Sequence, residues 1–356
     1  MSMNYFIREI INGDPTAGPK ARNDASDILQ ESGWVPLTLD FTFVEKAAEL
    51  DSRGFLRKLK DNLALRKEWR TQLRKIKAGD TVLAQFPVLR RPIARAWEFR
   101  AVQKRGGKVA LLIHDLELLR YNRRSDVGFL KKLRIKLEES AVLKCADSII
   151  AHNPKMIETL RGAGFADCRL ISLDIFDYLI PAFSGAERKL EKNVAIAGTL
   201  KPHKCQYLLR LPDNVSFQLY GIGYEDQGMP QVTYHGAFPP EELPGVLEAS
   251  FGLVWDGDSA DSCTGVSGEY LRINNPHKAS LYLASGLPVI IWKEAALSEF
   301  ITENGCGLSV NSLKEIGGRI TDLTEEEYQR MVANAARISE KLRGGEYLKK
   351  AVSQIN

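Results

Sequence analysis

The feature that most constrains this 356-residue chain is a regular alternation of short apolar runs with longer segments of helical period. Strands buried on both faces of a parallel sheet are apolar throughout, and each needs a crossover helix before the next. The alternation therefore predicts an α/β fold of the doubly wound type. In the first half of the chain, strands are expected at 5–11, 34–39, 81–86, 108–113, 148–152 and 169–173, with helices at 20–32, 91–104 and 128–144.

The alternation is interrupted once and then begins again. The interruption, 181–192, is polar and rich in turn residues, which is typical of an interdomain linker. Two Rossmann-like domains, 1–180 and 193–343, are therefore predicted, and we expect the ligand site in the cleft between them. In the second domain, strands are expected at 193–197, 215–220, 251–255, 288–292 and 307–310, with helices at 240–249, 276–285 and 325–341.

Composition limits the class of protein. With 44% apolar and 26% charged residues and a net charge of only +4, the chain does not resemble a disordered one. Its longest apolar runs are about six residues, whereas a membrane span needs about 20. Arg8 and Glu9 interrupt the N-terminal apolar stretch, and five cysteines form no framework, so we expect a cytoplasmic protein.

The positive charge is concentrated in the segment 53–77, which has ten Lys or Arg and two acidic residues. Its apolar residues have partly helical spacing: Phe55, Leu56, Leu59, Leu63, Trp69, Leu73 and Ile76. Such a segment can lie as a cationic helix on an anionic membrane, or it can pack its apolar face on its own domain. Both interpretations stay open here. Nucleic-acid binding is disfavoured because the aromatic residues are too few for base stacking.

Two segments of the second domain are candidate phosphate sites. Gly198 and Thr199 follow its first strand, where glycine lets the backbone approach a ligand and Lys204 can meet a diphosphate. The same residues also suit an ordinary loop with solvated lysines. The other segment, 275–278, opens the helix that runs to 285.

In this second segment, unpaired N–H groups at the helix N-terminus, together with His277 and Lys278, predict a diphosphate cradle. The alternative is simple capping, with Asn275 as the N-cap and Pro276 as the first helical residue.

Asp256 ends the strand 251–255 and opens a loop, 256–273, in which no secondary structure is expected. Asp256 and Asp258 form an Asp-x-Asp pattern, which can bind a metal on a nucleotide diphosphate. No further carboxylate or histidine has ligand spacing, and His203 and Cys205 are an isolated pair, so no metal site is predicted. We therefore expect Asp256 to contact the sugar or nucleotide, because loops of this length are usually functional.

The candidate base is Asp115, which follows His114 at the carboxyl end of the strand 108–113. Ligands of open α/β sheets bind at this edge, where Asp115 can accept a proton and His114 can orient neighbouring groups. Capping of the next segment carries equal weight, and Glu117 and Asp14 are rival bases. Gly18, in the turn after the first strand, is expected to face the cleft and offer backbone contacts, unless it only builds the loop.

Several longer segments resemble bacterial galactofuranosyltransferases of O-antigen assembly. The most specific are FGLVWDGDS at 251–259 and NNPHK within 268–278, supported by 280–283, 287–292, 18–27, 112–115, 151–154, 175–179 and 203–205. The resemblance covers nearly the whole chain. A more distant one, through IHD, FGLVW and LPVI, is to streptococcal glucosyltransferases that extend glycans on serine-rich adhesins.

The resemblance implies a GT-B fold, in which two Rossmann-like domains face each other across a cleft and the second holds the nucleotide sugar. It also implies that the C-terminal segment 344–356 packs back on the first domain, and that neither a cofactor nor a metal is needed. Many retaining GT-B enzymes carry a Glu-x7-Glu pair, but Ile273 and Leu281 occupy about the corresponding positions here. The missing pair favours an inverting transferase.

The expected function is transfer of a hexose, above all galactofuranose, from its UDP donor to a lipid-linked oligosaccharide in surface polysaccharide synthesis. Asp115 would be the base, while the helix beginning at Pro276, with His277, Lys278 and Lys204, would stabilise the departing UDP. The alternatives are a UDP-glucose or UDP-galactose transferase, a UDP-sugar 2-epimerase and a non-catalytic GT-B-like subunit. Such a protein has reason to touch the inner membrane surface through 53–77, and it could form a homo-oligomer.

Overall fold

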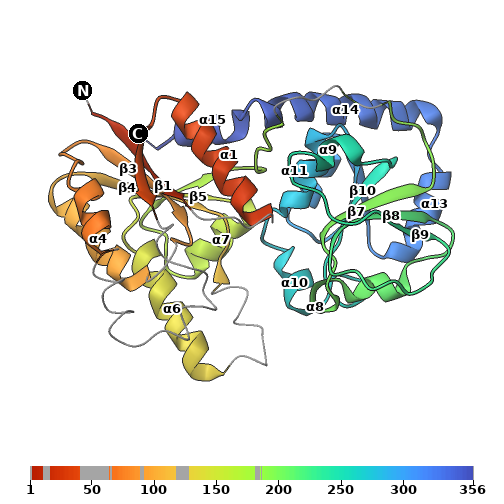
Figure 1. The fold of residues 1–356 in the computed structure, drawn as a ribbon, viewed down its shortest axis with the longest axis horizontal. Helices are drawn as coiled ribbons and strands as arrows, with labels where there is room; N and C mark the ends of the chain where they lie inside the picture. Colours follow the sequence, from red (N-terminus) through yellow and green to blue (C-terminus); the bar gives the residue numbers. More distant parts are fainter. Residues whose placement is uncertain are drawn as a thin grey trace.

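The structure, a computed structural model, contains two six-stranded parallel sheets, each in its own domain (Figure 1). It describes residues 2–10, 17–40, 64, 66–88, 92–117, 128–180, 185 and 187–355, and the side chains of 17, 18, 40, 92–94, 131 and 203 are not described. Within these ranges no helix combines the length and the apolar character needed to cross a bilayer. The predicted fold class is confirmed.

The first sheet has the strand order β2-β1-β3-β4-β5-β6. Its middle strands are buried on both faces, as the apolar runs predicted. In β4, Val109 and Leu111 face one core of the domain, while Ala110 and Leu112 face the other. The elements are β1 (Asn4–Ile10), α1 (Ala17–Glu31), β2 (Val35–Asp40), β3 (Thr81–Phe86), α4 (Pro92–Lys104), β4 (Lys108–Ile113), α6 (Phe129–Leu143), β5 (Ser148–Ala151), α7 (Pro154–Gly162) and β6 (Arg169–Ser172).

The second sheet has the order β12-β11-β10-β7-β8-β9. Gly252 in β10 allows α11 to lie against the sheet, because a Cβ there would be 2.2 Å from the Tyr282 ring. The elements are β7 (Asn193–Thr199), α8 (Pro202–Cys205), η1 (Gln206–Arg210), β8 (Ser216–Ile222), β9 (Val232–Tyr234), α9 (Leu243–Val246), β10 (Phe251–Val254), α10 (Gly265–Tyr270), α11 (His277–Ala284), β11 (Val289–Trp292), α12 (Ser298–Glu303), β12 (Gly307–Val310), η2 (Leu313–Glu315), α13 (Ile316–Thr321) and α14 (Glu325–Arg343).

Three expectations for this domain are corrected. The edge strand β9 was missed, because its three residues are only half-buried or exposed and form no apolar run. The helix expected at 240–249 is a single turn, Leu243–Val246, since Pro244 and Gly245 interrupt the pattern. The loop 256–273, expected to lack secondary structure, contains α10, which is too short to give a helical period.

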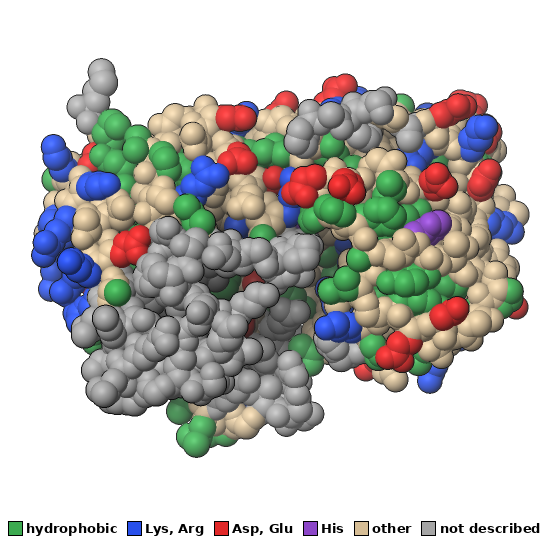
Figure 2. Space-filling model, viewed as in Figure 1, with side chains coloured by type: hydrophobic (Ala, Val, Ile, Leu, Met, Phe, Trp, Pro, Cys, Tyr) green, Lys and Arg blue, Asp and Glu red, His purple; other side chains and the backbone are tan. Residues whose placement is uncertain are grey.

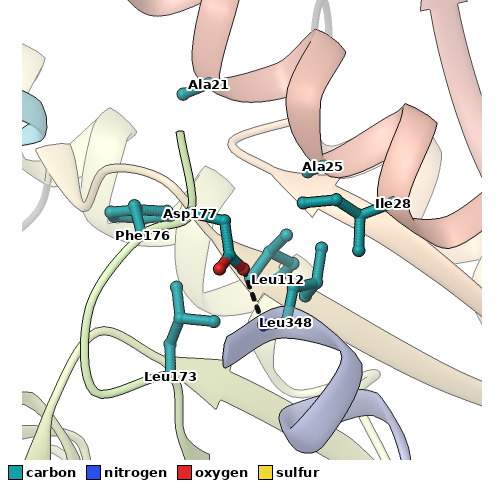
Figure 3. A pocket seen from close by; sticks show the side chains of 8 residues that line it. All are labelled: Ala21, Ala25, Ile28, Leu112, Leu173, Phe176, Asp177 and Leu348. Atoms are coloured by element: carbon teal, nitrogen blue, oxygen red, sulfur yellow. Dashed lines mark hydrogen bonds between the residues drawn. The ribbon is translucent and has the colours of Figure 1, made fainter. Parts of the chain in front are cut away.

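The C-terminal helix α15 (Glu346–Val352) packs on the first domain. Leu348 and Val352 are buried in the same core as Ile28 of α1. The Asp177 carboxylate accepts hydrogen bonds from the backbone N–H of Tyr347 and Leu348, although burial raises the pKa of Asp177 to about 7. A cavity of about 10 Å³ remains between α15 and the first domain (Figure 3), barely enough for one water molecule. It is a packing gap, too small for a substrate.

The membrane interpretation of 53–77 does not hold for the part that the structure describes. Residues 66–73 are helical, and Trp69, Leu73 and Ile76 are fully buried in the first domain. The Trp69 ring packs edge-on against Phe99, with ring centroids 5.9 Å apart. These side chains cannot enter a bilayer because they already pack within the protein. The other apolar residues of the segment, Phe55, Leu56, Leu59 and Leu63, lie outside the described residues.

Candidate active site between the two domains

The carboxyl ends of β4, β5 and β6 meet a short stretch of the second domain, 270–277. The backbone N–H of Leu116, after β4, donates to the Tyr270 hydroxyl at 3.0 Å. Asn153, after β5, donates its side-chain amide to the Ile273 carbonyl at 3.1 Å. Ligands of doubly wound sheets bind at these carboxyl ends. The interdomain seam is therefore also the place where a ligand of both domains would lie.

Asn275 connects the domains and does not cap α11, so its predicted capping role is wrong. The helix begins at His277 with Pro276 as the N-cap, and no side chain caps it. The Asn275 Nδ2 donates to the carbonyls of His152 at 2.6 Å and Asp174 at 3.0 Å, while its Oδ1 accepts from Asn153 Nδ2 at 2.7 Å. Its backbone N–H donates to His152 Nδ1 at 2.9 Å. These bonds satisfy a buried amide better than a local cap would.

Three histidines surround the Phe176 ring at this seam. The centroid of Phe176 lies 5.4 Å from that of His114, 4.9 Å from His152 and 5.9 Å from His277. Burial lowers the pKa of His152 to about 4, with Asp115 opposing the shift, and that of His277 to about 3, with Lys20 adding to it. Burial also holds the pKa of His114 well below its usual range. All three imidazoles are therefore neutral at neutral pH.

His152 is a site residue that sequence reasoning missed. Its Nδ1 accepts from the Asn275 N–H, so the proton of the neutral ring is on Nε2. That buried Nε2 has no hydrogen-bond partner among the described residues. The sequence did contain an indication for His152, since it lies at the carboxyl end of the strand expected at 148–152. His114 was chosen as a candidate because it has the same kind of position.

Asp115 lies in the seam, half-exposed, directly after His114. The His114 ring is held by Gln85, whose Oε1 is 2.7 Å from His114 Nε2. Asp115 Oδ1 accepts from the N–H of Leu116 at 2.9 Å, which is the local capping contact expected as the alternative. This contact orients the Asp115 carboxylate at the edge of the sheet. Of the rival bases, Glu117 is exposed and Asp14 lies outside the described residues.

The loops that follow β7 and β10 lie side by side. The Gly257 N–H donates to the Lys204 carbonyl at 2.9 Å. Gly198 has φ +123, a conformation that side chains disfavour, and a Cβ on Gly221 of β8 would lie 1.7 Å from the Gly198 carbonyl oxygen. The structure therefore brings Gly198, Thr199 and Lys204 to one edge of the sheet together with the residues after β10. Gly18 lies in the first domain, in the first turn of α1.

Lys278 and Asp256 form a buried ion pair. Lys278 Nζ lies 2.7 Å from Asp256 Oδ1 and donates to the Trp255 carbonyl at 3.0 Å. Burial alone would lower the pKa of Lys278, but the Asp256 carboxylate raises it above its usual value. The pair ties the first turn of α11 to the end of β10. Lys278 therefore has a structural partner, in addition to any contact with a phosphate.

Among the described residues, no three His, Cys, Asp or Glu side chains come together as metal ligands. The Asp258 carboxylate accepts a hydrogen bond from the Thr264 hydroxyl, and Asp256 is bonded to Lys278. The two aspartates of the Asp-x-Asp pattern thus each have a partner within the protein.

Comparison with known proteins identifies relatives over the whole chain. Residues 4–175 match the N-terminal domain of the glucosyltransferase 3-like family, and residues 194–355 match its C-terminal domain. The beta-1,6-galactofuranosyltransferase WbbI of Escherichia coli (strain K12) is 32% identical over 99% of this chain and 98% of its own length. Glucosyltransferase 3 of Streptococcus gordonii is 25% identical over 93% and 92%.

Among solved structures, sucrose-phosphate synthase from Thermosynechococcus elongatus is similar with a TM-score of 0.63. The similarity covers 99% of this chain and 98% of that one, at 14% sequence identity. At this identity the similarity concerns the fold alone, which is the GT-B arrangement of two facing domains.

Proposed function

The chain belongs to the glucosyltransferase 3-like family of glycosyltransferases, and from this premise we propose that it transfers galactofuranose from UDP-galactofuranose to a hydroxyl of a lipid-linked oligosaccharide. The choice of sugar is supported by the Escherichia coli relative, which is named a galactofuranosyltransferase and matches end to end. The streptococcal relative is named a glucosyltransferase, so UDP-glucose is the second candidate donor.

The observation that carries the proposal is the meeting of the candidate base with the start of α11. His114, next to Asp115, and His277, the first residue of α11, flank the same Phe176 ring. A donor whose diphosphate lies at the N-terminus of α11 has its sugar close to Asp115. An acceptor hydroxyl that enters between the domains can then reach both the donor sugar and Asp115.

In this mechanism Asp115 takes the proton of the acceptor hydroxyl, while the oxygen of that hydroxyl bonds to C1 of the donor sugar. The bond from C1 to the phosphate oxygen breaks, and UDP leaves with the electron pair. Attack from the face opposite UDP inverts the configuration at C1, and a single base is sufficient. The N–H groups at the start of α11 and the Lys204 ammonium stabilise the charge that grows on UDP. Lys278 and Asp256 hold α11 in position for this.

Two alternative functions make different demands on the protein. A UDP-sugar 2-epimerase needs no acceptor, and membership in a glycosyltransferase family argues against it. A non-catalytic subunit would bind UDP poorly, and its binding to a partner transferase would not change in Asp115→Asn.

The test combines a donor panel with one substitution. Purified protein is incubated with UDP-galactofuranose, UDP-galactose and UDP-glucose and candidate acceptors, and products are identified by mass spectrometry. Asp115→Asn is expected to reduce turnover at least a hundredfold at unchanged melting temperature, because general bases contribute about 10²–10⁴-fold. Glu117→Gln is the matched control and should retain activity. Full activity of Asp115→Asn would refute the assignment of the base, and product from UDP-glucose alone would refute that of the donor.

A further inference from the structure

The helix α6 carries an apolar stripe on its outer face. Four large side chains point to solvent: Phe129 is 76% exposed, Leu130 79%, Leu133 40% and Leu137 57%. At 100° per residue they fall within one third of the helix circumference. The inner face of α6 is buried through Ile135, Val142 and Leu143, so the helix is packed on the domain while the four side chains of the stripe stay exposed.

Positive charge surrounds this α6 stripe, which comprises Phe129, Leu130, Leu133 and Leu137. By the same helical geometry, Lys132 and Lys136 lie on one side of it, and Arg134, whose Nε is 2.8 Å from Glu138 Oε1, lies on the other. The segment 128–139 contains four Lys or Arg and two acidic residues, Glu138 and Glu139, a surplus of two positive charges. An apolar stripe flanked by cations is the pattern of helices that lie in the interface of an anionic membrane.

The α6 stripe also lies at the correct end of the domain. The Glu117 N–H, just beyond β4, donates to the side chain of Glu139, so the middle of α6 is level with the carboxyl end of the sheet. From Glu139 back to Phe129 is ten residues, or about 15 Å of helix. In Figure 1 this part of α6 projects from the first domain at the lower edge of the view, and Figure 2 shows hydrophobic side chains at the same tip.

We propose that the α6 stripe docks the protein on the surface of an anionic bilayer. This proposal rests on the proposed function, because a lipid-linked acceptor presents its sugar near the membrane. Docked in this way, the helix would bring the edge of the sheet that carries Asp115 to within about 15 Å of the lipid headgroups. A second copy of the chain is a less suitable partner, because a symmetric contact along α6 would set the net positive charge of this helix against its own copy.

The experiment measures sedimentation of the full-length protein with vesicles, without donor or acceptor. Vesicles of phosphatidylglycerol and phosphatidylcholine should bind the protein, vesicles of phosphatidylcholine alone should bind it weakly, and 0.5 M salt should weaken the binding. The double variant Leu130→Asp, Leu137→Asp should bind anionic vesicles at least tenfold more weakly. The control is Leu209→Asp, at a leucine of η1 in the second domain that is 52% exposed. It should bind as the wild type does.

Each other outcome overturns the proposal. Equal binding of the double variant and the wild type would show that α6 is not the docking surface. No vesicle binding by the wild type, with a dimer in light scattering that the double variant abolishes, would show that a second copy covers the stripe. Transfer to a water-soluble acceptor should be unchanged in the double variant. Vesicle binding needs no catalysis. A failure to bind vesicles would therefore leave the transferase proposal intact. Conversely, a failure of the transfer assay would not account for a loss of vesicle binding.

Discussion

Replacement of Lys278 by methionine tests whether this lysine is structural. Methionine preserves most of the apolar length of the side chain but removes the ammonium group. The variant leaves the Asp256 carboxylate, whose side chain is 8% exposed, without its ion-pair partner, and the Trp255 carbonyl loses a donor at 3.0 Å. Breaking a buried ion pair from one side costs about 3–5 kcal/mol. We expect a loss of this size for Lys278→Met.

For a domain of this size each kcal/mol corresponds to a shift of about 2–4 °C in melting temperature, so the expected decrease is roughly 6–20 °C. Calorimetry and urea unfolding measure it. The double variant Lys278→Met, Asp256→Asn removes both charges and should regain part of the loss, giving a coupling energy of about 1–3 kcal/mol. Lys201→Met, at an exposed lysine of the neighbouring loop, is the control and should unfold as the wild type does.

A melting temperature of Lys278→Met within 2 °C of the wild type would refute this reasoning, given the slope of about 2–4 °C per kcal/mol. If such a stable variant were also inactive, Lys278 would act on the donor diphosphate directly, and Asp256 would not need it for folding.

Three other predictions concern the seams. His277→Phe should lose less stability in acid than the wild type. Burial of neutral His152 and His277 costs no stability above about pH 6.5, and the cost grows as the pH falls toward about 4 and 3, their lowered pKa values, because the unfolded chain binds more protons there. Urea unfolding at pH 7.5 and 4.5 measures the difference, and equal acid losses in variant and wild type would contradict the prediction. Asn275→Ala should cost about 2–3 kcal/mol, since buried groups around His152 lose partners, and should speed limited proteolysis between the domains; unchanged proteolysis would count against a connecting role. Leu348→Asp should release α15 from Ile28 and lower stability by about 2–5 kcal/mol, and an unchanged melting temperature would show that α15 contributes little.

Sequence reasoning located the strands well where burial leaves little choice. The strand β4 is apolar along its length because helices cover both faces of the sheet, and its predicted bounds, 108–113, match. The edge strand β9 was missed because half-exposed residues carry no such pattern. Residues at the carboxyl ends of strands, such as Asp115, could be chosen from sequence, since the topology of a parallel sheet places them at one edge.

Local rules failed where a distant partner was available. Asn275 has the residue type and position of a helix cap, yet its amide pairs across the domains with Asn153, His152 and Asp174. The position of Lys278 predicted a cation available to a phosphate. In the structure its Nζ lies 2.7 Å from Oδ1 of Asp256, which is 22 residues earlier in the chain. Such partners are set by the packing of α11 on β10 and of one domain on the other.

The two cationic amphipathic segments show the division most clearly. Composition and period identified 53–77 as a segment with an apolar face and excess positive charge, and α6 has the same pattern. For 53–77 the sequence predicted an apolar face, whereas for 128–144 it predicted only a helix. Only the tertiary structure decided that Trp69 and Leu73 are covered by their own domain while Leu130 and Leu137 are not. The physical reason is that periodicity depends on neighbouring residues, whereas burial depends on which other elements of the chain pack against that face.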